Sequence, residues 1–210
     1  MMNKQNYSIS LENTIKDLAA SGKRKSLLLH ACCAPCSSYV LEYLSQYFDI
    51  TLFFFNPNIS PEDEYLFRAD ELERLVGQMP LPTSVKIMRG RYEPKEFYDM
   101  AKGMEELDEG GARCYKCYRL RLEETAKQAQ KLQYDYFCTT LSISPYKNAD
   151  WLNSIGGELA KNYGVEYLFS DFKKKNGYKR SCELSNLYSL YRQDYCGCEF
   201  SKKAAQNRKK

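Results

Sequence analysis

Short apolar runs alternate with longer stretches of helical periodicity along most of this 210-residue chain. KSLLLH at residues 25–30 has the length of one buried strand, whereas the stretches between such runs repeat their apolar residues every three to four positions. Strands that alternate with helices of ten or more residues indicate βαβ units. We therefore predict an α/β fold, with a mostly parallel sheet of about five strands and helices on both faces.

The boundaries follow from turn and capping residues. Asn56-Pro57-Asn58 ends the second strand, Ser60 is the expected N-cap before Pro61, and Gly164 ends a later helix. The predicted strands are 25–30, 49–58, 83–88, 134–142 and 165–170. The predicted helices are 37–48, 60–79, 93–107, 114–132, 148–164 and 180–191, preceded by an amphipathic helix in the first 24 residues.

Polar and thiol-bearing loops follow several of these strands. Cys32 and Cys33 follow the first strand, TTLSISPYKN at 139–148 spans the end of the fourth, and Asp171 follows the fifth. In an open parallel sheet, ligands bind beyond the carboxyl ends of the strands. We therefore expect these loops to converge on one functional face.

Seven of the nine cysteines are clustered: Cys32, Cys33, Cys36, Cys114, Cys117, Cys196 and Cys198. The chain shows no secretory signal and no run of about 18 apolar residues, so we expect no membrane span and a cytoplasmic protein. In that reducing compartment, clustered thiols more often bind metal or carry out redox chemistry than staple the fold.

The spacing of the first five clustered cysteines favours an iron–sulfur cluster over zinc. CYKC at 114–117 is a C-x2-C pair, whose two thiolates can reach one metal centre. The adjacent Cys32 and Cys33 suit a [4Fe–4S] cluster better than one small ion, because neighbouring thiolates can each bind a different iron. Cys36 could replace one of these four ligands, bind a second metal ion or stay free.

Cys196 and Cys198 are separated only by Gly197. The α-carbons of residues i and i+2 fall within disulfide reach, and glycine permits the unusual backbone angles of such a small ring. A strained disulfide is labile and redox-active. The alternative, that both thiols are further metal ligands, stays open.

Other polar residues near the expected face are less specific. Cys138 and Cys182 are expected to be small, mostly buried hydrophobic residues. His30, the single histidine, could be structural or functional. Four side chains are candidate proton donors: Asp171, Asp194, Tyr178 and Tyr195.

The net charge of +4 is unevenly distributed. Residues 201–210 carry five Lys or Arg and no acid, and a second basic run occupies 173–180. Such a tail could be a solubilising, disordered end or an arm that binds phosphates, and a polyanion would gain affinity from either run by releasing counterions. The basic run gives five candidate nucleic-acid contacts: Lys173, Lys174, Lys175, Lys179 and Arg180.

Together, five motifs resemble the cobalamin-independent epoxyqueuosine reductases, the QueH-type family. They are HACCAPC (30–36), ARCYKCYRLRL (112–122), TTLSISPYKN (139–148), SDFKKKNGYKRS (170–181) and YRQDYCGCEF (191–200). The resemblance runs from about Lys25 to Phe200. It implies one α/β catalytic domain over 25–200, of a nucleotide-binding type like the adenine nucleotide alpha-hydrolases, between an N-terminal helical extension at 1–24 and a basic tail at 201–210.

The resemblance also implies an activity. Such enzymes reduce the epoxide of epoxyqueuosine, at the wobble position of tRNA, to queuosine, using an electron donor that the sequence does not identify. By this resemblance, Cys32, Cys33, Cys114 and Cys117 would hold a [4Fe–4S] cluster, and a second metal ion is a further option. Cys196 and Cys198 would form the redox-active disulfide.

Two other functions share some of these features. An ATP-dependent tRNA thiolase would use the same fold, but it needs a glycine-rich phosphate loop, and HACCAPCSS contains no glycine. A non-enzymatic zinc protein that binds nucleic acid would explain CYKC and the basic runs. It gives no reason for the adjacent Cys32 and Cys33, or for Cys-Gly-Cys.

Overall fold

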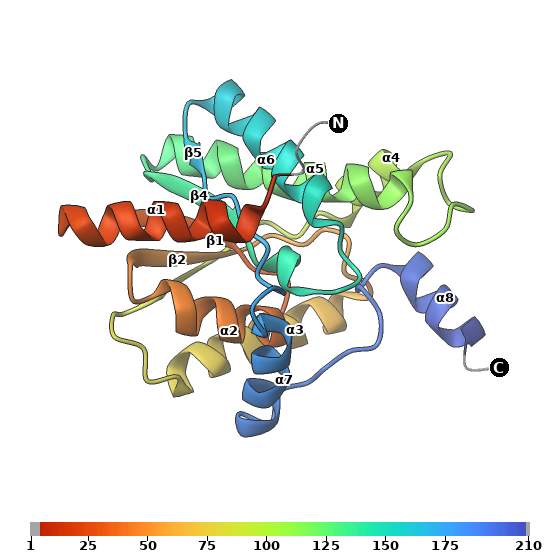
Figure 1. Cartoon of the computed structure of the whole chain (residues 1–210). Helices are drawn as coiled ribbons and strands as arrows, with labels where there is room; N and C mark the ends of the chain where they lie inside the picture. Colours follow the sequence, from red (N-terminus) through yellow and green to blue (C-terminus); the bar gives the residue numbers. More distant parts are fainter. Residues whose placement is uncertain (1–4, 209–210) are drawn as a thin grey trace.

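A computed structural model of the protein describes residues 5–208 (Figure 1). One parallel sheet has the strand order β3-β2-β1-β4-β5. Its strands are β1 (Lys25–His30), β2 (Phe48–Phe54), β3 (Lys86–Arg89), β4 (Tyr136–Thr139) and β5 (Glu166–Tyr167). The order reverses between β1 and β4, as in doubly wound nucleotide-binding folds. The predicted α/β class is confirmed.

Helices cover both faces of the sheet. Figure 1 shows α5 and α6 on one face and α2, α3 and α7 on the other. The helices are α1 (Tyr7–Ser21), α2 (Ala34–Leu44), α3 (Glu62–Gln78), α4 (Pro94–Ala101), α5 (Ala112–Lys131), α6 (Ala149–Tyr163), α7 (Gly177–Leu187) and α8 (Glu199–Arg208), with a 3-10 turn, η1, at Thr140–Ile143. In residues 5–208, no helix combines the length and the apolarity that crossing a bilayer requires.

The strands divide their side chains between two apolar layers. On β1, Leu27 and Leu29 pack toward α2 and α3, whereas Leu28 packs with residues of α5 and α6. Phe54 and Phe53 of β2 divide in the same way. Successive side chains of a strand point to opposite faces, so a strand that is buried on both faces reads as a continuous apolar run.

Several boundaries differ from the sequence prediction. α2 begins at Ala34, three residues earlier than predicted, because Pro35 fits the first turn of a helix. The prediction that Ser60 caps α3 was wrong: Pro61 is the N-cap residue and the helix begins at Glu62. β5 is only two residues long, since it pairs with β4 at two positions on the edge of the sheet.

Both terminal segments contain helix. α1 places Leu11 and Ile15 in the apolar layer shared with α2, and Asn6 caps its start. Residues 201–208, predicted to be a disordered end or a phosphate-binding arm, belong to helix α8, in which Ser201 and Ala205 are buried. Residues 1–4 of the predicted extension and 209–210 of the predicted tail lie outside the described residues.

Candidate metal and redox site

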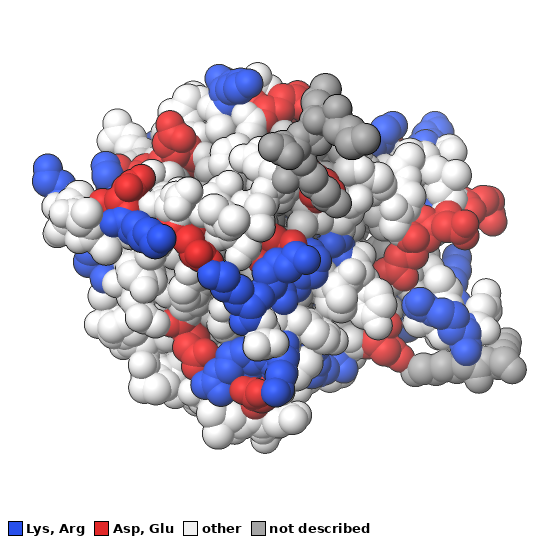
Figure 2. All heavy atoms as spheres, viewed as in Figure 1, with Lys and Arg blue, Asp and Glu red and all other residues white. Residues whose placement is uncertain are grey.

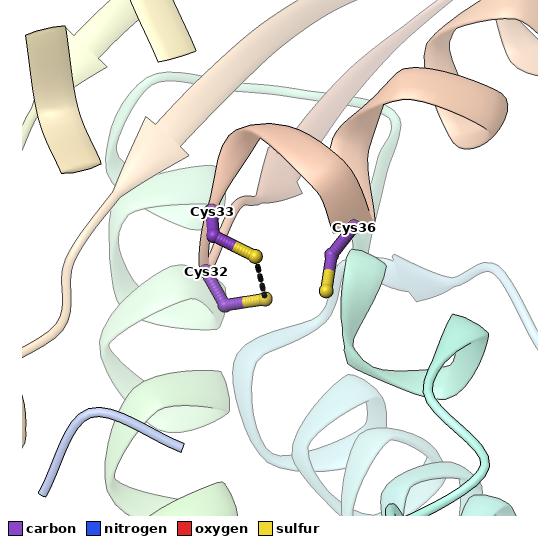
Figure 3. A group of neighbouring side chains, drawn as sticks. All are labelled: Cys32, Cys33 and Cys36. Atoms are coloured by element: carbon purple, nitrogen blue, oxygen red, sulfur yellow. Dashed lines mark hydrogen bonds between the residues drawn. The ribbon is translucent and has the colours of Figure 1, made fainter. Parts of the chain in front are cut away.

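Three thiols meet where β1 passes into α2 (Figure 3). The sulfur atoms of Cys32, Cys33 and Cys36 lie within 4.8 Å of one another, and those of Cys32 and Cys33 are 3.7 Å apart. Cys33 is the N-cap residue of α2, so Cys36 lies one turn further on the same helix face. The early start of α2 therefore brings Cys36 to the two adjacent cysteines.

Contacts among these three thiols shift the pKa of each. Hydrogen bonds from Cys32 and Cys36 lower the pKa of Cys33 well below its usual value, with a contribution from the Arg68 charge. The hydrogen bond to Cys33 raises the pKa of Cys32 to about 11, and its neighbours raise the pKa of Cys36 as well. The first thiolate thus forms on Cys33, stabilised by two neighbouring thiols as donors. A thiolate is the form that binds metal.

The three thiols open onto a cavity of about 520 Å³. It lies where the predicted loops converge, beyond the carboxyl ends of β1 and β4. Its wall includes residues of α2, η1, α5 and α7 as well as the segment before α8. Besides the three thiols, the wall includes Arg68, Glu109, Arg121, Ser144, Tyr146, Lys147, Tyr178, Arg192, Asp194, Tyr195 and Cys196.

Cys114 and Cys117 lie on the first turns of α5. Their thiols are not part of the three-thiol group, but Cys114 and Cys32 pack against the same apolar cluster. The Gly110 N–H donates to Cys114 Sγ (3.2 Å), and burial raises the pKa of Cys117 to about 11. The two cysteines therefore sit beside the cavity rather than in its wall.

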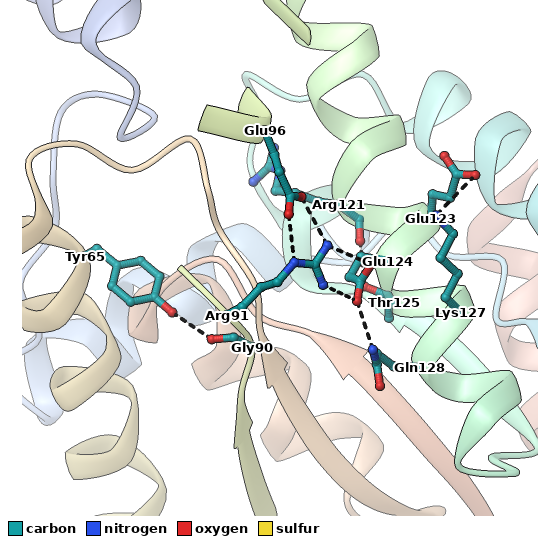
Figure 4. Close-up of polar contacts among 10 residues, drawn as sticks. All are labelled: Tyr65, Gly90, Arg91, Glu96, Arg121, Glu123, Glu124, Thr125, Lys127 and Gln128. Carbon is teal, nitrogen blue, oxygen red and sulfur yellow. Dashed lines mark hydrogen bonds and ion pairs between the residues drawn. The ribbon is translucent and has the colours of Figure 1, made fainter. Parts of the chain in front are cut away.

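Arg91 ties α5 to the rest of the fold (Figure 4). Its guanidinium donates to Glu124 of α5 (2.7 Å) and to Glu96 of α4 (2.7 Å). Gln128 donates to the same Glu124 carboxylate (2.9 Å). This network holds the helix that carries Cys114 and Cys117 against the end of β3.

The Cys196-Gly197-Cys198 turn is held from several sides. Cys196 N–H donates to Ser201 Oγ (2.9 Å), and Arg68 donates to the Cys196 carbonyl (3.3 Å). The Gly197 carbonyl accepts from Ser60 N–H (3.0 Å). Cys196 reaches the cavity, whereas Cys198 is buried beside Cys117, and burial raises its pKa to about 12. All nine cysteines are free thiols in this structure.

Three buried cations around these thiols were not predicted from the sequence. Arg68, Arg121 and Lys147 are only 2%, 1% and 8% exposed, and all three line the cavity. Burial lowers the pKa of Lys147, but the neighbouring Cys196 outweighs it, so the pKa is raised. One of the three had a sequence signal, because Arg121 follows Cys114 and Cys117 at helical spacing (i, i+3, i+7).

His30 has a structural role. Its ring is fully buried between Thr139 Oγ1 and the Phe55 carbonyl, each 3.0 Å away. Burial, followed by the charge of Arg121, lowers the pKa of His30 to about 4, so the ring is neutral near pH 7. Cys138 is fully buried in the core, as predicted.

Three of the four candidate proton donors line the cavity, namely Tyr178, Asp194 and Tyr195. Tyr195 lies under the guanidinium of Arg68, 5.2 Å from its carbon to the ring centroid. Burial raises the pKa of Tyr178 and of Tyr195, so the hydroxyls of these two residues stay protonated at neutral pH. Asp171 lies outside this wall and pairs with Lys173 (2.7 Å).

The five predicted nucleic-acid contacts lie in or just before α7, where Figure 2 shows Lys and Arg gathered over the surface. Three of them pair with carboxylates: Lys173 with Asp171, Lys175 with Glu12, and Arg180 with Glu42 and Glu183. The exposed Lys174 and Lys179 form no ion pair within residues 5–208. Tyr178, in the same segment, lines the cavity.

Comparison with known proteins identifies the family. The family model described as "Epoxyqueuosine reductase QueH" matches residues 27–204. The epoxyqueuosine reductase QueH of Staphylococcus epidermidis is 48% identical over 94% of this chain and 85% of its own. That of Thermotoga maritima is 36% identical over 84% of this chain and 90% of its own.

A solved structure, the U34-tRNA thiolase NcsA from Methanococcus maripaludis with its [4Fe-4S] cluster, overlaps 95% of this chain and 71% of its own. The TM-score is 0.49 at 12% identity, and this overlap supports no inference about the site. The family model and the curated relatives, in contrast, cover most of the chain at substantial identity. The chain belongs to the epoxyqueuosine reductase QueH family.

Proposed function

We propose that this protein reduces the epoxide of epoxyqueuosine in tRNA to the cyclopentene-diol of queuosine. Membership in the QueH family supports the reaction. The observation that carries the proposal to particular residues is that thiols from two separate segments line one cavity, while a third pair, on α5, lies beside it. The lining thiols are those of Cys32, Cys33, Cys36 and Cys196. A cavity of about 520 Å³ lies in the range of small-molecule sites, which accommodate a single modified nucleoside.

The residues fit an iron–sulfur cluster. Cys32 and Cys33 converge with Cys36 at the cavity, and Cys114 and Cys117 approach from α5. We assign Cys32, Cys33, Cys114 and Cys117 as the ligands of a [4Fe–4S] cluster, with Cys36 available as an additional ligand or for a second metal ion. When bound, such a cluster passes single electrons at low potential.

Together, Cys196 and Cys198 can supply the two electrons that the reduction of one epoxide requires. One epoxide and two thiols give one alkene, one water and one disulfide, so the thiols supply two electrons and, in the overall balance, two protons. Cys196 faces the cavity beside the Lys147 ammonium. A separate electron donor then restores the two thiols.

Protonation of the leaving oxygen is assigned to the cavity wall. Tyr178 and Tyr195 carry hydroxyls that stay protonated at neutral pH, because burial raises their pKa. Asp194 lines the same wall. For the tRNA backbone, the exposed Lys174 and Lys179 are the available cations of the basic segment, which borders the cavity through Tyr178.

The two other functions are not favoured. A tRNA thiolase would bind ATP at the loop after β1, but that loop carries Cys32, Cys33 and Cys36 and no glycine. A zinc-binding protein without enzymatic activity does not fit a chain whose relatives are reductases. It also gives no role to Cys196 at the cavity wall.

The test is an anaerobic assay of the purified protein. The protein is incubated with tRNA carrying epoxyqueuosine and dithionite, and the nucleosides are identified by mass spectrometry after digestion. We expect queuosine from the wild type and none from Cys117→Ala, with iron and sulfide content lost in that variant. Cys138→Ala is the matched control, since Cys138 is a buried cysteine of the sheet core, and should keep both. A colourless wild-type protein with stoichiometric zinc and no turnover would refute the proposal.

A further inference from the structure

Arg121 is the most deeply buried cation of the cavity, with 1% of its surface exposed. It lies on α5 one turn beyond Cys117, on the helix face that also carries Cys114. Its guanidinium lines the cavity together with Cys32 and Cys196. A permanent positive charge thus lies among thiols from three separate segments.

Among residues 5–208, no carboxylate forms an ion pair with Arg121. Its Nε donates to the Cys117 carbonyl (3.3 Å), and its Nη2 has no hydrogen-bond partner. Glu124, one turn further along α5, is directed to Arg91 and Gln128 instead (Figure 4). The carboxylate best placed by helix geometry is therefore already engaged elsewhere.

The other two buried cations differ in this respect. Arg68 pairs with Glu64 (2.7 Å), and Lys147 lies 4.0 Å from Glu109. Burying an unpaired charge is strongly unfavourable, so proteins pair such charges or let them meet a bound ion. For Arg121, the nearest groups that can carry negative charge are the thiols of Cys117, Cys196 and Cys32. The Tyr118 phenol also lies nearby, with its ring centroid 5.9 Å from the guanidinium carbon.

We propose that Arg121 is the counter-cation of the thiolate-bound cluster and raises its reduction potential. This inference rests on the proposed function, because the cluster supplies the negative charge. One electron from a reductant such as dithionite makes the cluster one unit more negative, so a fixed cation nearby stabilises the reduced form more than the oxidised form. Arg121 is thereby a residue that tunes the electron transfer and need not touch the substrate.

The experiment compares Arg121→Met, which removes the charge, with Arg121→Lys, which keeps it. Arg119→Met is the matched control, because Arg119 lies on the same helix, is partly exposed and pairs with Glu158 (2.7 Å). Iron and sulfide are quantified first, and the midpoint potential is then measured by spectroscopic titration with dithionite.

We expect Arg121→Met to lower the ratio of reduced to oxidised cluster at a given potential about tenfold, a shift of about 59 mV for one electron. Arg121→Lys and Arg119→Met should stay close to the wild type. An unchanged potential in a cluster-containing Arg121→Met variant would overturn the inference. If the wild type also turns over epoxyqueuosine, the proposed function would survive that result.

A second measurement covers loss of the cluster in the variant. If Arg121→Met folds without a cluster while Arg121→Lys keeps one, the role of the charge is supported; loss from both variants overturns it. In the cluster-free protein, the buried and unpaired charge of Arg121 destabilises the folded state. Cluster-free Arg121→Met should therefore have a higher melting temperature than cluster-free wild type. A lower melting temperature, or failure of this variant to fold, would show that Arg121 serves the fold and would also overturn the inference.

Discussion

Gly197 allows the two thiols on either side of it to belong to one tight turn. Its φ of +117° lies in a region that residues with a side chain rarely adopt. A Cβ at this position would also meet Arg68 Nη1 and Ile59 Cγ1, both at 3.0 Å. Holding another residue in such a backbone conformation costs about 1–3 kcal/mol. Geometry at this residue therefore controls the relation between Cys196 and Cys198.

We expect Gly197→Ala to keep the fold and the iron content but to lower epoxyqueuosine turnover about tenfold, which corresponds to about 1.4 kcal/mol of lost transition-state stabilisation. Closure of the Cys196–Cys198 disulfide, followed by mass spectrometry, should slow in parallel. Gly22→Ala is the control, because Gly22 also has a positive φ (+64°) and caps α1 away from the cavity. Equal turnover in Gly197→Ala and wild type would rule out a role for this turn.

Residue patterns in the sequence predicted the thiol inventory of the site but only part of its geometry. The adjacent Cys32 and Cys33 and the C-x2-C pair predicted a metal-binding function without any coordinates, and this assignment stays a prediction. Cys36 stayed ambiguous because the helix was predicted to begin after it, which hid its i, i+3 relation to Cys33. Arg121 was missed because its unpaired burial depends on Glu124 turning to Arg91, a choice made by tertiary packing.

At the scale of elements, α8 shows how packing overrides local sequence. SKKAAQNRKK has few apolar residues and gave no helical signal strong enough to predict structure. In the fold, Phe200 packs on Phe97, with ring centroids 6.0 Å apart, in the cluster that contains Cys117 and Cys198. The Ser201 hydroxyl accepts from Cys196 N–H and donates to Glu109. The first turn of α8 therefore packs against Cys117 and Cys198 and holds the backbone of Cys196.

Removal of α8 by truncation after Cys198 should expose that thiol. In the metal-free truncated protein, we expect alkylation of Cys198 by iodoacetamide to be at least about tenfold faster than in the metal-free full-length protein. Cys198 is only 7% exposed in the full-length protein, and modification requires access to the thiol. Peptide mass spectrometry gives the rate for each cysteine, and Cys138 in the sheet core is the internal control. Parallel acceleration at Cys138 would indicate general unfolding, and no acceleration at Cys198 would contradict the covering role of α8.

At the scale of the whole molecule, the sheet topology brings the candidate site residues together beyond the carboxyl ends of the strands. The alternation of strands and helices was sufficient to predict that the loops after β1 and β4 would meet. Which of the basic side chains near α7 form ion pairs with carboxylates could not be predicted in the same way. Lys175 and Arg180 are paired with Glu12 of α1 and Glu42 of α2, which lie far away in sequence. Lys173 is paired with the nearby Asp171.

This distribution predicts which cations bind tRNA. We expect the double variant Lys174→Gln, Lys179→Gln to bind tRNA more weakly and with a shallower dependence on salt. If each lysine contacts one phosphate of the single-stranded anticodon loop, the slope of log K against log salt should fall by about 0.7 per lysine.

The matched control is Arg180→Gln, which removes a charge already neutralised by Glu42 and Glu183 and should change the slope less. Affinity is measured by fluorescence anisotropy across a potassium chloride series. A double variant with the wild-type slope would place the tRNA backbone elsewhere on the molecule, whereas a larger effect from Arg180→Gln would show that its ion pairs open when RNA binds.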